Sequence, residues 1–105
     1  MNQENQEELA GYRQQIDEID HDIIKLLAQR TAIVKKLMVL KTDEESVKSC
    51  DRVQQVLDKV SHIAEANGLE PHIVVPVYQT LIKVLTEMQL EHLRSRQGIA
   101  GVAND

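Results

Sequence analysis

The sequence predicts an all-α fold of three helices, one of them a very long N-terminal helix, that assembles as an intertwined helical homodimer. Apolar residues recur at intervals of three and four along most of the 105 residues, which is the spacing of one buried helix face. The run IVVPV at 73–77 has a composition typical of a strand, but the chain contains no second strand with which it could pair. The first periodic stretch is also longer than a compact domain of this size can cover, which predicts the dimer.

The first helix is expected from about residue 6 to about residue 41. Asn5 and Glu8 have the spacing of a capping pair at its start, and no proline interrupts it. Its apolar stripe skips position 30 and comprises Leu9, Tyr12, Ile16, Ile19, Ile23, Leu26, Ile33, Leu37 and Leu40. About 36 residues span about 54 Å of helix, whereas a domain of about 100 residues has a radius of gyration of about 13 Å. The stripe would protrude from a monomer, and a second copy of the same helix is the simplest cover.

Two further helices follow a polar loop. The stretch TDEESVKS at 42–49 reads as the loop, and Ser49 is the expected cap of the second helix. That helix should end just before Gly68, because glycine favours the left-handed conformation that closes many helices. Pro71 is expected to start the third helix, which should end before Gly98.

One segment of the third helix is ambiguous. The run IVVPV at 73–77 is β-branched, but we interpret it as helical because the chain offers it no partner strand. Pro76 removes a backbone donor there and is expected to bend or delay the helix. The chain as a whole, residues 1–105, is expected to form one domain with frayed ends at 1–5 and 98–105.

Composition and charge exclude several classes of protein. Two tyrosines, no Trp and no Phe leave no platform for stacking bases, and a net charge of −5 repels a phosphate backbone, so no nucleic-acid partner is expected. No stretch approaches the roughly 18 apolar residues of a membrane span, and the N-terminus does not resemble a signal peptide. We therefore expect a cytoplasmic protein without a membrane partner. The single Cys50 cannot form an internal disulfide.

Three positively charged residues lie in or beside the apolar stripe. Arg30 occupies its gap, where a charge is either a ligand-binding group or a residue that sets helix register or pairs with a carboxylate. Arg13 and Lys41 lie at the edge of the stripe, and each alone reads as a surface residue. About 16 Å of helix separates residues 30 and 41, and about 25 Å separates 13 and 30. One small dianionic substrate can thus be gripped by Arg30 and Lys41, with Arg13 delivered only by an antiparallel partner.

Few other residues have a type and spacing that would suit a catalytic or metal-binding site. Gln89 lies beside Leu85 and Met88 on the inner edge of the third helix, where its amide can donate to a ligand oxygen, although a surface glutamine is the alternative. The four histidines lack metal-ligand spacing, and no phosphate loop or nucleophile grouping occurs, so neither a metal nor a cofactor is expected. What remains is a set of groups that grip anions. A pericyclic reaction needs no nucleophile or general base.

These residues resemble the all-α class of chorismate mutases over nearly the whole chain. The resemblance is carried by YRQQIDEIDHDIIKLLAQRTAIVKKLMVLK, by Asp51-Arg52-Val53, by ANGLE and by YQTLIKVLTEMQLEHL. It implies two interlocked chains, two sites that each take one arginine from the partner, and no cofactor. The implied activity is the rearrangement of chorismate to prephenate in aromatic amino acid biosynthesis.

The resemblance also implies a role for each site residue. Arg13 of the partner subunit and Arg30 would hold the substrate carboxylates, and Arg52 would add positive charge near the ring carboxylate. Lys41 and Gln89 would bind the ether oxygen. Catalysis would then consist of selecting the compact substrate conformer and stabilising negative charge on that oxygen as its bond breaks.

Two residues that would line this site depart from the typical mutase pattern. Val53 stands where such mutases carry Glu, and Leu85 stands where they carry a small polar residue. These departures, with a slightly shorter loop between Lys41 and Arg52, resemble the isochorismate pyruvate lyase branch of the same fold, which makes salicylate and pyruvate. The mutase is our first interpretation and the lyase our second. The third is a non-catalytic helical dimerisation module, in which protein carboxylates satisfy Arg30.

Overall fold

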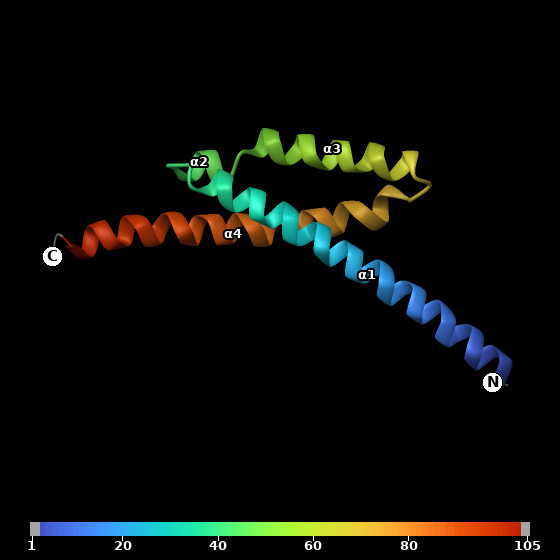
Figure 1. The fold of residues 1–105 in the computed structure, drawn as a ribbon. Helices are drawn as coiled ribbons and strands as arrows, with labels where there is room; N and C mark the ends of the chain where they lie inside the picture. The colour runs from blue at the N-terminus through green and yellow to red at the C-terminus, as the bar shows by residue number, and fades with distance from the viewer. Residues whose placement is uncertain (1–2, 104–105) are drawn as a thin grey trace. The chain divides into compact units, whose positions relative to one another are not determined.

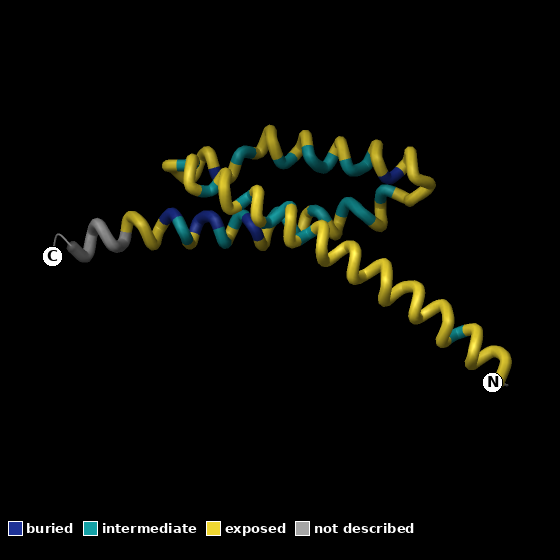
Figure 2. Tube along the Cα trace, viewed as in Figure 1, coloured by how far each residue is buried: buried dark blue, intermediate teal, exposed yellow. Residues whose placement is uncertain are grey.

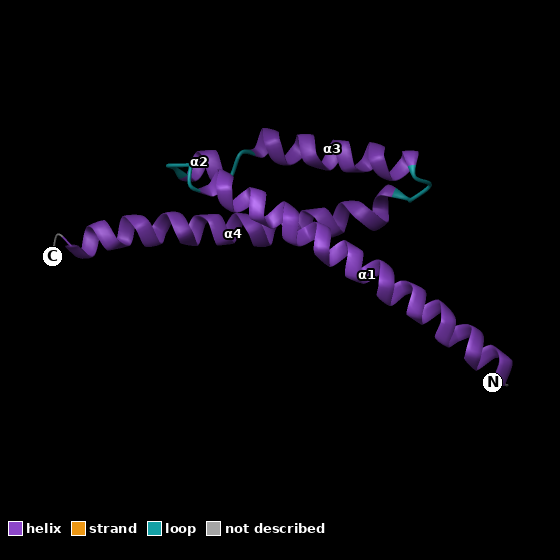
Figure 3. Cartoon of the chain, viewed as in Figure 1, coloured by secondary structure: helices purple, strands orange, loops and turns teal. Residues whose placement is uncertain are grey.

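The structure, a computed structural model, describes the backbone of residues 3–103 and the side chains of residues 3–97. Every element in this range is helical, as predicted, and short loops join the helices (Figure 3). The helices are α1 (Gln3–Met38), α2 (Glu44–Val47), α3 (Cys50–Ala66) and α4 (Pro71–Ala103). The chain divides into two units, Met1–Val34 and Lys35–Asp105, and each is described by itself.

The long helix α1 begins and ends earlier than expected. Asn5 lies inside the helix, so the capping pair predicted from Asn5 and Glu8 is wrong. Glu4 in the first turn favours this earlier start, because a carboxylate there interacts well with the helix dipole. At the other end, the Leu40 amide donates to the Leu37 carbonyl at 3.0 Å, which is a tightened turn rather than a continued α-helix. Lys41 therefore follows α1 instead of closing it.

The apolar stripe of α1 is exposed from Tyr12 to Leu37, and Leu9 before it is partly buried. No residue of the helix is buried. The stripe residues are 48% to 62% exposed at Tyr12, Ile16, Ile19, Ile23, Leu26, Ile33 and Leu37. A helix of 36 residues is about 54 Å long, so this is a long uncovered apolar surface for one chain.

The loop expected at 42–49 contains one helical turn, α2, which the sequence interpretation missed. Asp43 caps it, because its Oδ1 accepts hydrogen bonds from the Ser46 hydroxyl at 2.6 Å and the Ser46 amide at 2.7 Å. The hydroxyl contact and then the amide contact lower the pKa of Asp43. Val47, at the end of the turn, is buried, and α2 packs against α4.

The ends of α3 confirm the local signals in the sequence. The Ser49 hydroxyl accepts a hydrogen bond from the Arg52 amide at 3.3 Å, which is the predicted N-cap. At the C-terminal end, Gly68 has the left-handed φ of 71°, and the Leu69 amide donates to the Ala64 carbonyl at 2.8 Å. The chain then turns back, and α3 and α4 form a helical hairpin (Figure 1).

Helix α4 starts at Pro71 as predicted and includes 73–77, which confirms the helical interpretation of that run. Pro76 does not delay it. The predicted end before Gly98 is wrong, because α4 continues to Ala103. No proline follows Pro76, and a glycine inside a helix costs only about 1 kcal/mol. Of the fraying expected at the two ends, residues 1–2 and 104–105 lie outside the described range.

The buried residues gather on α4, which is where the dark segments of Figure 2 concentrate. Leu85, Leu90 and Leu93 are each less than 9% exposed. A fully buried leucine contributes about 1.5–3 kcal/mol relative to an exposed one, so these three anchor the second unit. Gln89 is also buried, in the middle of this apolar run. Among the residues that the structure describes, no helix is long and apolar enough to cross a membrane.

Candidate active site

Lys41 and Gln89 form the polar contact at the centre of the candidate site. Gln89 is only 6% exposed, so its predicted position on the inner side of the last long helix is confirmed. Lys41 is partly buried and follows the turn that closes α1. Its Nζ donates to Gln89 Oε1 at 2.9 Å, although the two residues are 48 positions apart in the chain. The fold thus places an ammonium group beside a buried amide.

The orientation of the Gln89 amide is determined by its two neighbours. An ammonium can only donate, so the atom that meets Lys41 is the amide oxygen. A carbonyl can only accept, so the atom that meets the Leu85 carbonyl, at 3.3 Å, is Nε2. After these contacts, two hydrogens on Lys41 Nζ and one on Gln89 Nε2 remain for a ligand. Leu85 contributes its backbone to the site, and its side chain is buried.

The C-terminal half of α4 also contacts the segment that carries Lys41. Arg96 Nη2 donates to the Lys41 carbonyl oxygen at 2.8 Å. Our sequence interpretation did not single out Arg96, although it follows Gln89 by one heptad and so lies on the same face of the helix. His92 lies between them on that face, and its Nε2 is buried without a hydrogen-bond partner in the described part of the chain.

Arg52 and Val53 lie in the first turn of α3. The Arg52 side chain is exposed, and Val53 is partly buried. Their backbone amides donate to Ser49, at Oγ and at the carbonyl oxygen, and this fixes the start of the helix. Within the described residues, no hydrogen bond or ion pair joins Arg52 to Lys41 or Gln89. Their predicted place in the site stays a prediction.

Arg13 and Arg30 both lie on α1. Arg13 is exposed, whereas Arg30 is partly buried and so less exposed than its stripe neighbours Leu26 and Ile33. The two arginines are joined by unbroken helix, which separates them by about 25 Å along its axis. One small ligand cannot contact both of them in the same chain. The separation estimated from residues 30 to 41 is not valid for the folded chain, because α1 ends at Met38.

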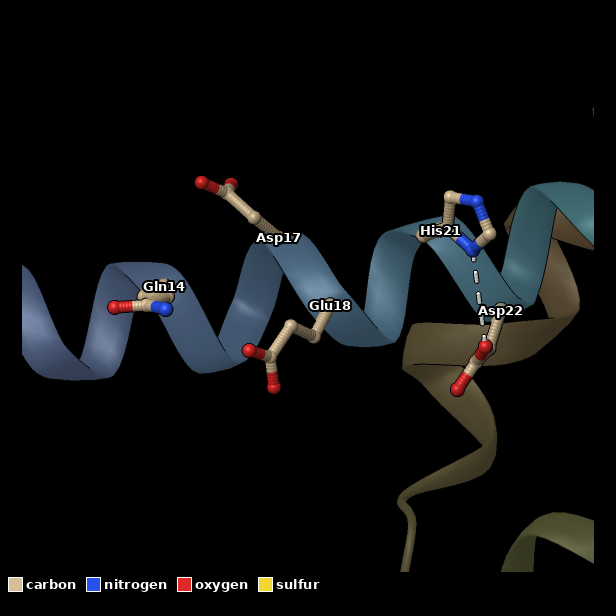
Figure 4. Close-up of a pocket in the computed structure, with 5 residues that line it drawn as sticks. All are labelled: Gln14, Asp17, Glu18, His21 and Asp22. Carbon is tan, nitrogen blue, oxygen red and sulfur yellow. Dashed lines mark ion pairs between the residues drawn. The ribbon is translucent and has the colours of Figure 1, made fainter.

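A shallow hollow on α1 is unsuited to an anionic ligand. It is lined by Gln14, Asp17, Glu18, His21 and Asp22. All five side chains come from one helix, and Figure 4 shows His21 pairing with Asp22, with 3.9 Å between Nδ1 and Oδ1. Its three carboxylates would repel a dianion. In the described part of the chain these residues do not form a group that could hold a metal ion.

Comparison with known proteins assigns the chain to a family. The family model for type II chorismate mutases matches residues 12–90, which include α3 and most of α1. The chain belongs to the type II chorismate mutase family. The matched range contains Lys41 and Gln89 but ends before Arg96.

Three relatives of this chain carry three activities in their names, namely chorismate mutase, isochorismate pyruvate lyase and prephenate dehydratase. A chorismate mutase of Methanocaldococcus jannaschii is 27% identical over 92 residues, which cover 87% of this chain and 93% of that protein. An isochorismate pyruvate lyase of Pseudomonas aeruginosa is 32% identical over 92 residues, which cover 88% of this chain and 91% of that protein. A bifunctional chorismate mutase/prephenate dehydratase of Buchnera aphidicola is 27% identical over 79% of this chain, which corresponds to 22% of that longer protein. Over most of its length the chain is thus similar both to a chorismate mutase and to an isochorismate pyruvate lyase.

Proposed function

We propose that this chain is a chorismate mutase that rearranges chorismate to prephenate within a homodimer. The observation that carries the proposal is the contact between Lys41 Nζ and Gln89 Oε1, with Gln89 Nε2 anchored at the Leu85 carbonyl. The remaining hydrogens of the ammonium and the amide can donate to one ligand oxygen. That oxygen is the ether oxygen of the substrate.

The proposed reaction needs little else from the protein. The ether C–O bond breaks while a C–C bond forms within the same molecule, so no atom is gained or lost and no proton has to be moved. Negative charge grows on the ether oxygen as its bond breaks. The Lys41 ammonium and the Gln89 amide stabilise that charge, and donors already fixed in place cost no reorganisation during the reaction. The fixed amide orientation is therefore part of the catalytic advantage.

Substrate binding is proposed to depend on arginines from two chains. Arg30 and Arg13 of the partner subunit bind the two substrate carboxylates, while Arg52 adds positive charge near the ring carboxylate. The separation of about 25 Å between Arg13 and Arg30 supports this division, because one chain cannot bring both to a small ligand. Two arginines that hold both carboxylates also restrict the substrate to a compact conformer, which removes much of the entropic barrier.

The homodimer is supported by the exposed stripe of α1. A partner must present an apolar surface about as long as the helix, about 54 Å, and a second α1 has that length and that pattern. Arg30, in the gap of the stripe, would then lie inside the assembly instead of on its surface. In this arrangement the two units of each chain serve as one functional domain.

Isochorismate pyruvate lyase is the second candidate. Val53 and Leu85 favour it, because neither side chain can form a hydrogen bond with the ring hydroxyl of chorismate. In that reaction the same ether C–O bond breaks, a ring hydrogen passes to the released pyruvate, and the ring becomes salicylate. Charge again grows on the ether oxygen, so Lys41 and Gln89 keep their proposed roles.

A product assay distinguishes these functions. Purified protein is incubated separately with chorismate and isochorismate, and prephenate, salicylate and pyruvate are quantified by chromatography. We expect prephenate from chorismate, and a larger kcat/KM for salicylate formation would assign the lyase instead. Lys41→Met, which keeps the length of the side chain without its charge, is the matched control and should be inactive on both substrates. If the wild-type protein accelerates neither reaction, both enzymatic proposals are wrong.

A further inference from the structure

We infer that Arg96 is a positioning residue for Lys41, an inference that rests on the proposed role of Lys41 in the reaction. Arg96 Nη2 donates to the backbone carbonyl of Lys41 at 2.8 Å, and the two residues are 55 positions apart. The contact therefore ties the C-terminal part of α4 to the turn after α1. Nothing in the family match assigns a role to Arg96, because the match ends at residue 90.

The carbonyl that Arg96 binds belongs to an irregular piece of backbone. Lys41 follows the last turn of α1, where only one weak i to i−3 bond of 3.3 Å, from the Lys41 amide to the Met38 carbonyl, holds its amide. The next helical turn begins only at Glu44. The Arg96 contact is exposed, but a guanidinium on the Lys41 carbonyl still constrains a residue that helical hydrogen bonding leaves loosely held, and charge-assisted hydrogen bonds are stronger than neutral ones.

Both ends of Lys41 are then attached to one face of α4. Its side chain donates to Gln89, and its carbonyl accepts from Arg96, one heptad further along the helix. These two contacts define the position of Lys41 along α4 and the direction of its ammonium group. Since the donors that stabilise charge in a transition state must be held in place, loss of the Arg96 contact should lower the rate of reaction more than it weakens substrate binding.

The neighbouring Arg94 provides a matched control. Its Nη2 lies 3.7 Å from Glu44 Oε1, so it joins α4 to α2 through an exposed ion pair, and within the described residues no hydrogen bond or ion pair links it to Lys41. Exposed ion pairs of this kind contribute little to stability. Arg94→Leu and Arg96→Leu therefore make the same chemical change two residues apart, and only the second removes the contact with Lys41.

The first measurement does not depend on enzymatic activity. The unliganded proteins are treated briefly with acetic anhydride, and acetylation of Lys41 Nζ is quantified by mass spectrometry relative to Lys59, an exposed lysine on α3. We expect Arg96→Leu to raise the relative acetylation rate of Lys41 about fivefold, because a lysine side chain that is released from its partner is open to the reagent more often, and the reagent acylates its amine after the ammonium loses a proton. Arg94→Leu should leave this ratio unchanged, and Arg96→Lys, which can still donate to the carbonyl, should restore much of the protection.

The second measurement is steady-state kinetics with chorismate and isochorismate. We expect Arg96→Leu to lower kcat about tenfold with little change in KM, since small displacements of a catalytic group reduce rates strongly while the arginines that bind carboxylates are untouched. Arg96→Lys should recover most of the loss, and Arg94→Leu should behave like the wild-type protein.

Each outcome decides the inference. Unchanged Lys41 acetylation in Arg96→Leu, or equal kcat losses in the Arg94 and Arg96 variants, would overturn it. If Arg96→Leu does not fold, Arg96→Gln replaces it, and failure of both to fold would also overturn it by assigning Arg96 a purely structural role. If the wild-type protein turns over neither substrate, the proposed function fails, while the acetylation ratios still decide whether Arg96 positions Lys41.

Discussion

The ammonium of Lys41 lies 2.9 Å from the amide oxygen of Gln89, and this contact joins the turn after α1 to the buried face of α4. Because the Leu85 carbonyl accepts from the other end of the amide, the side chain of Gln89 has one orientation. A group that is buried, oriented and uncharged is suited to donate to a ligand oxygen over a wide range of pH.

Replacing Gln89 with Glu should make the activity depend on pH, with the highest activity under acidic conditions. The ionised carboxylate has no hydrogen to donate to the ether oxygen and would face the Leu85 carbonyl with a second acceptor, whereas the protonated acid can donate. We expect the activity of Gln89→Glu to be greatest at low pH and to fall as the pH rises through the pKa of the new carboxyl group. The measurement is kcat/KM across the pH range in which the fold is intact.

Gln89→Met is the matched control, because it keeps the length of the side chain without a donor. It should have low activity at every pH. A pH profile of Gln89→Glu that superimposes on that of the wild-type protein would remove Gln89 from the site.

Replacing Arg30 with Leu should separate stability from activity. Arg30 interrupts an apolar stripe, and hydrophobic residues usually stabilise such positions better than a charge does. We expect Arg30→Leu to keep or raise the melting temperature while turnover falls at least about 100-fold, as for loss of a preorganised charge-stabilising group. Lys25→Leu makes a similar change at an exposed position of the same helix and should leave turnover intact. Arg30→Leu with normal turnover would show that Arg30 only sets register.

Replacing Val53 with Glu should favour chorismate over isochorismate. A carboxylate at this position can accept a hydrogen bond from the ring hydroxyl of chorismate, which valine cannot. We expect the ratio of kcat/KM for prephenate formation to that for salicylate formation to rise about tenfold or more, as when a site gains a hydrogen bond to one substrate only. Val53→Leu, which changes size without adding polarity, is the control. An unchanged ratio would mean that position 53 does not contact the ring.

Much of the fold was predictable because its signals are local. Ser49, Gly68 and Pro71 act through their own backbone or side-chain chemistry, and each begins or ends a helix as expected. The turn α2 was missed although Asp43 is a local capping signal, because the polar composition of 42–49 is typical of a loop and the burial of Val47 accompanies the packing of α2 against α4. The end of α1 was also missed, because Val39 and Leu40 continue the apolar composition of the helix after its backbone hydrogen bonds have changed from the i to i−4 to the i to i−3 pattern.

The candidate site was also predictable only in part. The inward direction of Gln89 follows from its position in the helical repeat of apolar residues, and a single sequence is enough to show that repeat. The pairing of Gln89 with Lys41 and the contact from Arg96 depend on how the chain folds between residues 41 and 89, which spacing along one helix does not encode. The heptad interval from Gln89 to Arg96 is present in the sequence, but the sequence interpretation did not use it and Arg96 was missed. Whether Arg13 reaches the site depends on a second chain, so it stays a prediction.

Subunit complementation tests the central claim, which is that one site is built by two chains. Homodimers of Arg13→Ala and of Lys41→Ala should each be nearly inactive, because every site lacks one cation. In a mixed dimer, one site carries both defects, and the other takes Arg13 from the Lys41→Ala chain and Lys41 from the Arg13→Ala chain. After unfolding and refolding an equimolar mixture, random pairing should restore about a quarter of the wild-type activity, as two-fold symmetry requires. No recovery, with subunit exchange verified by mass spectrometry of intact dimers, would contradict the shared site.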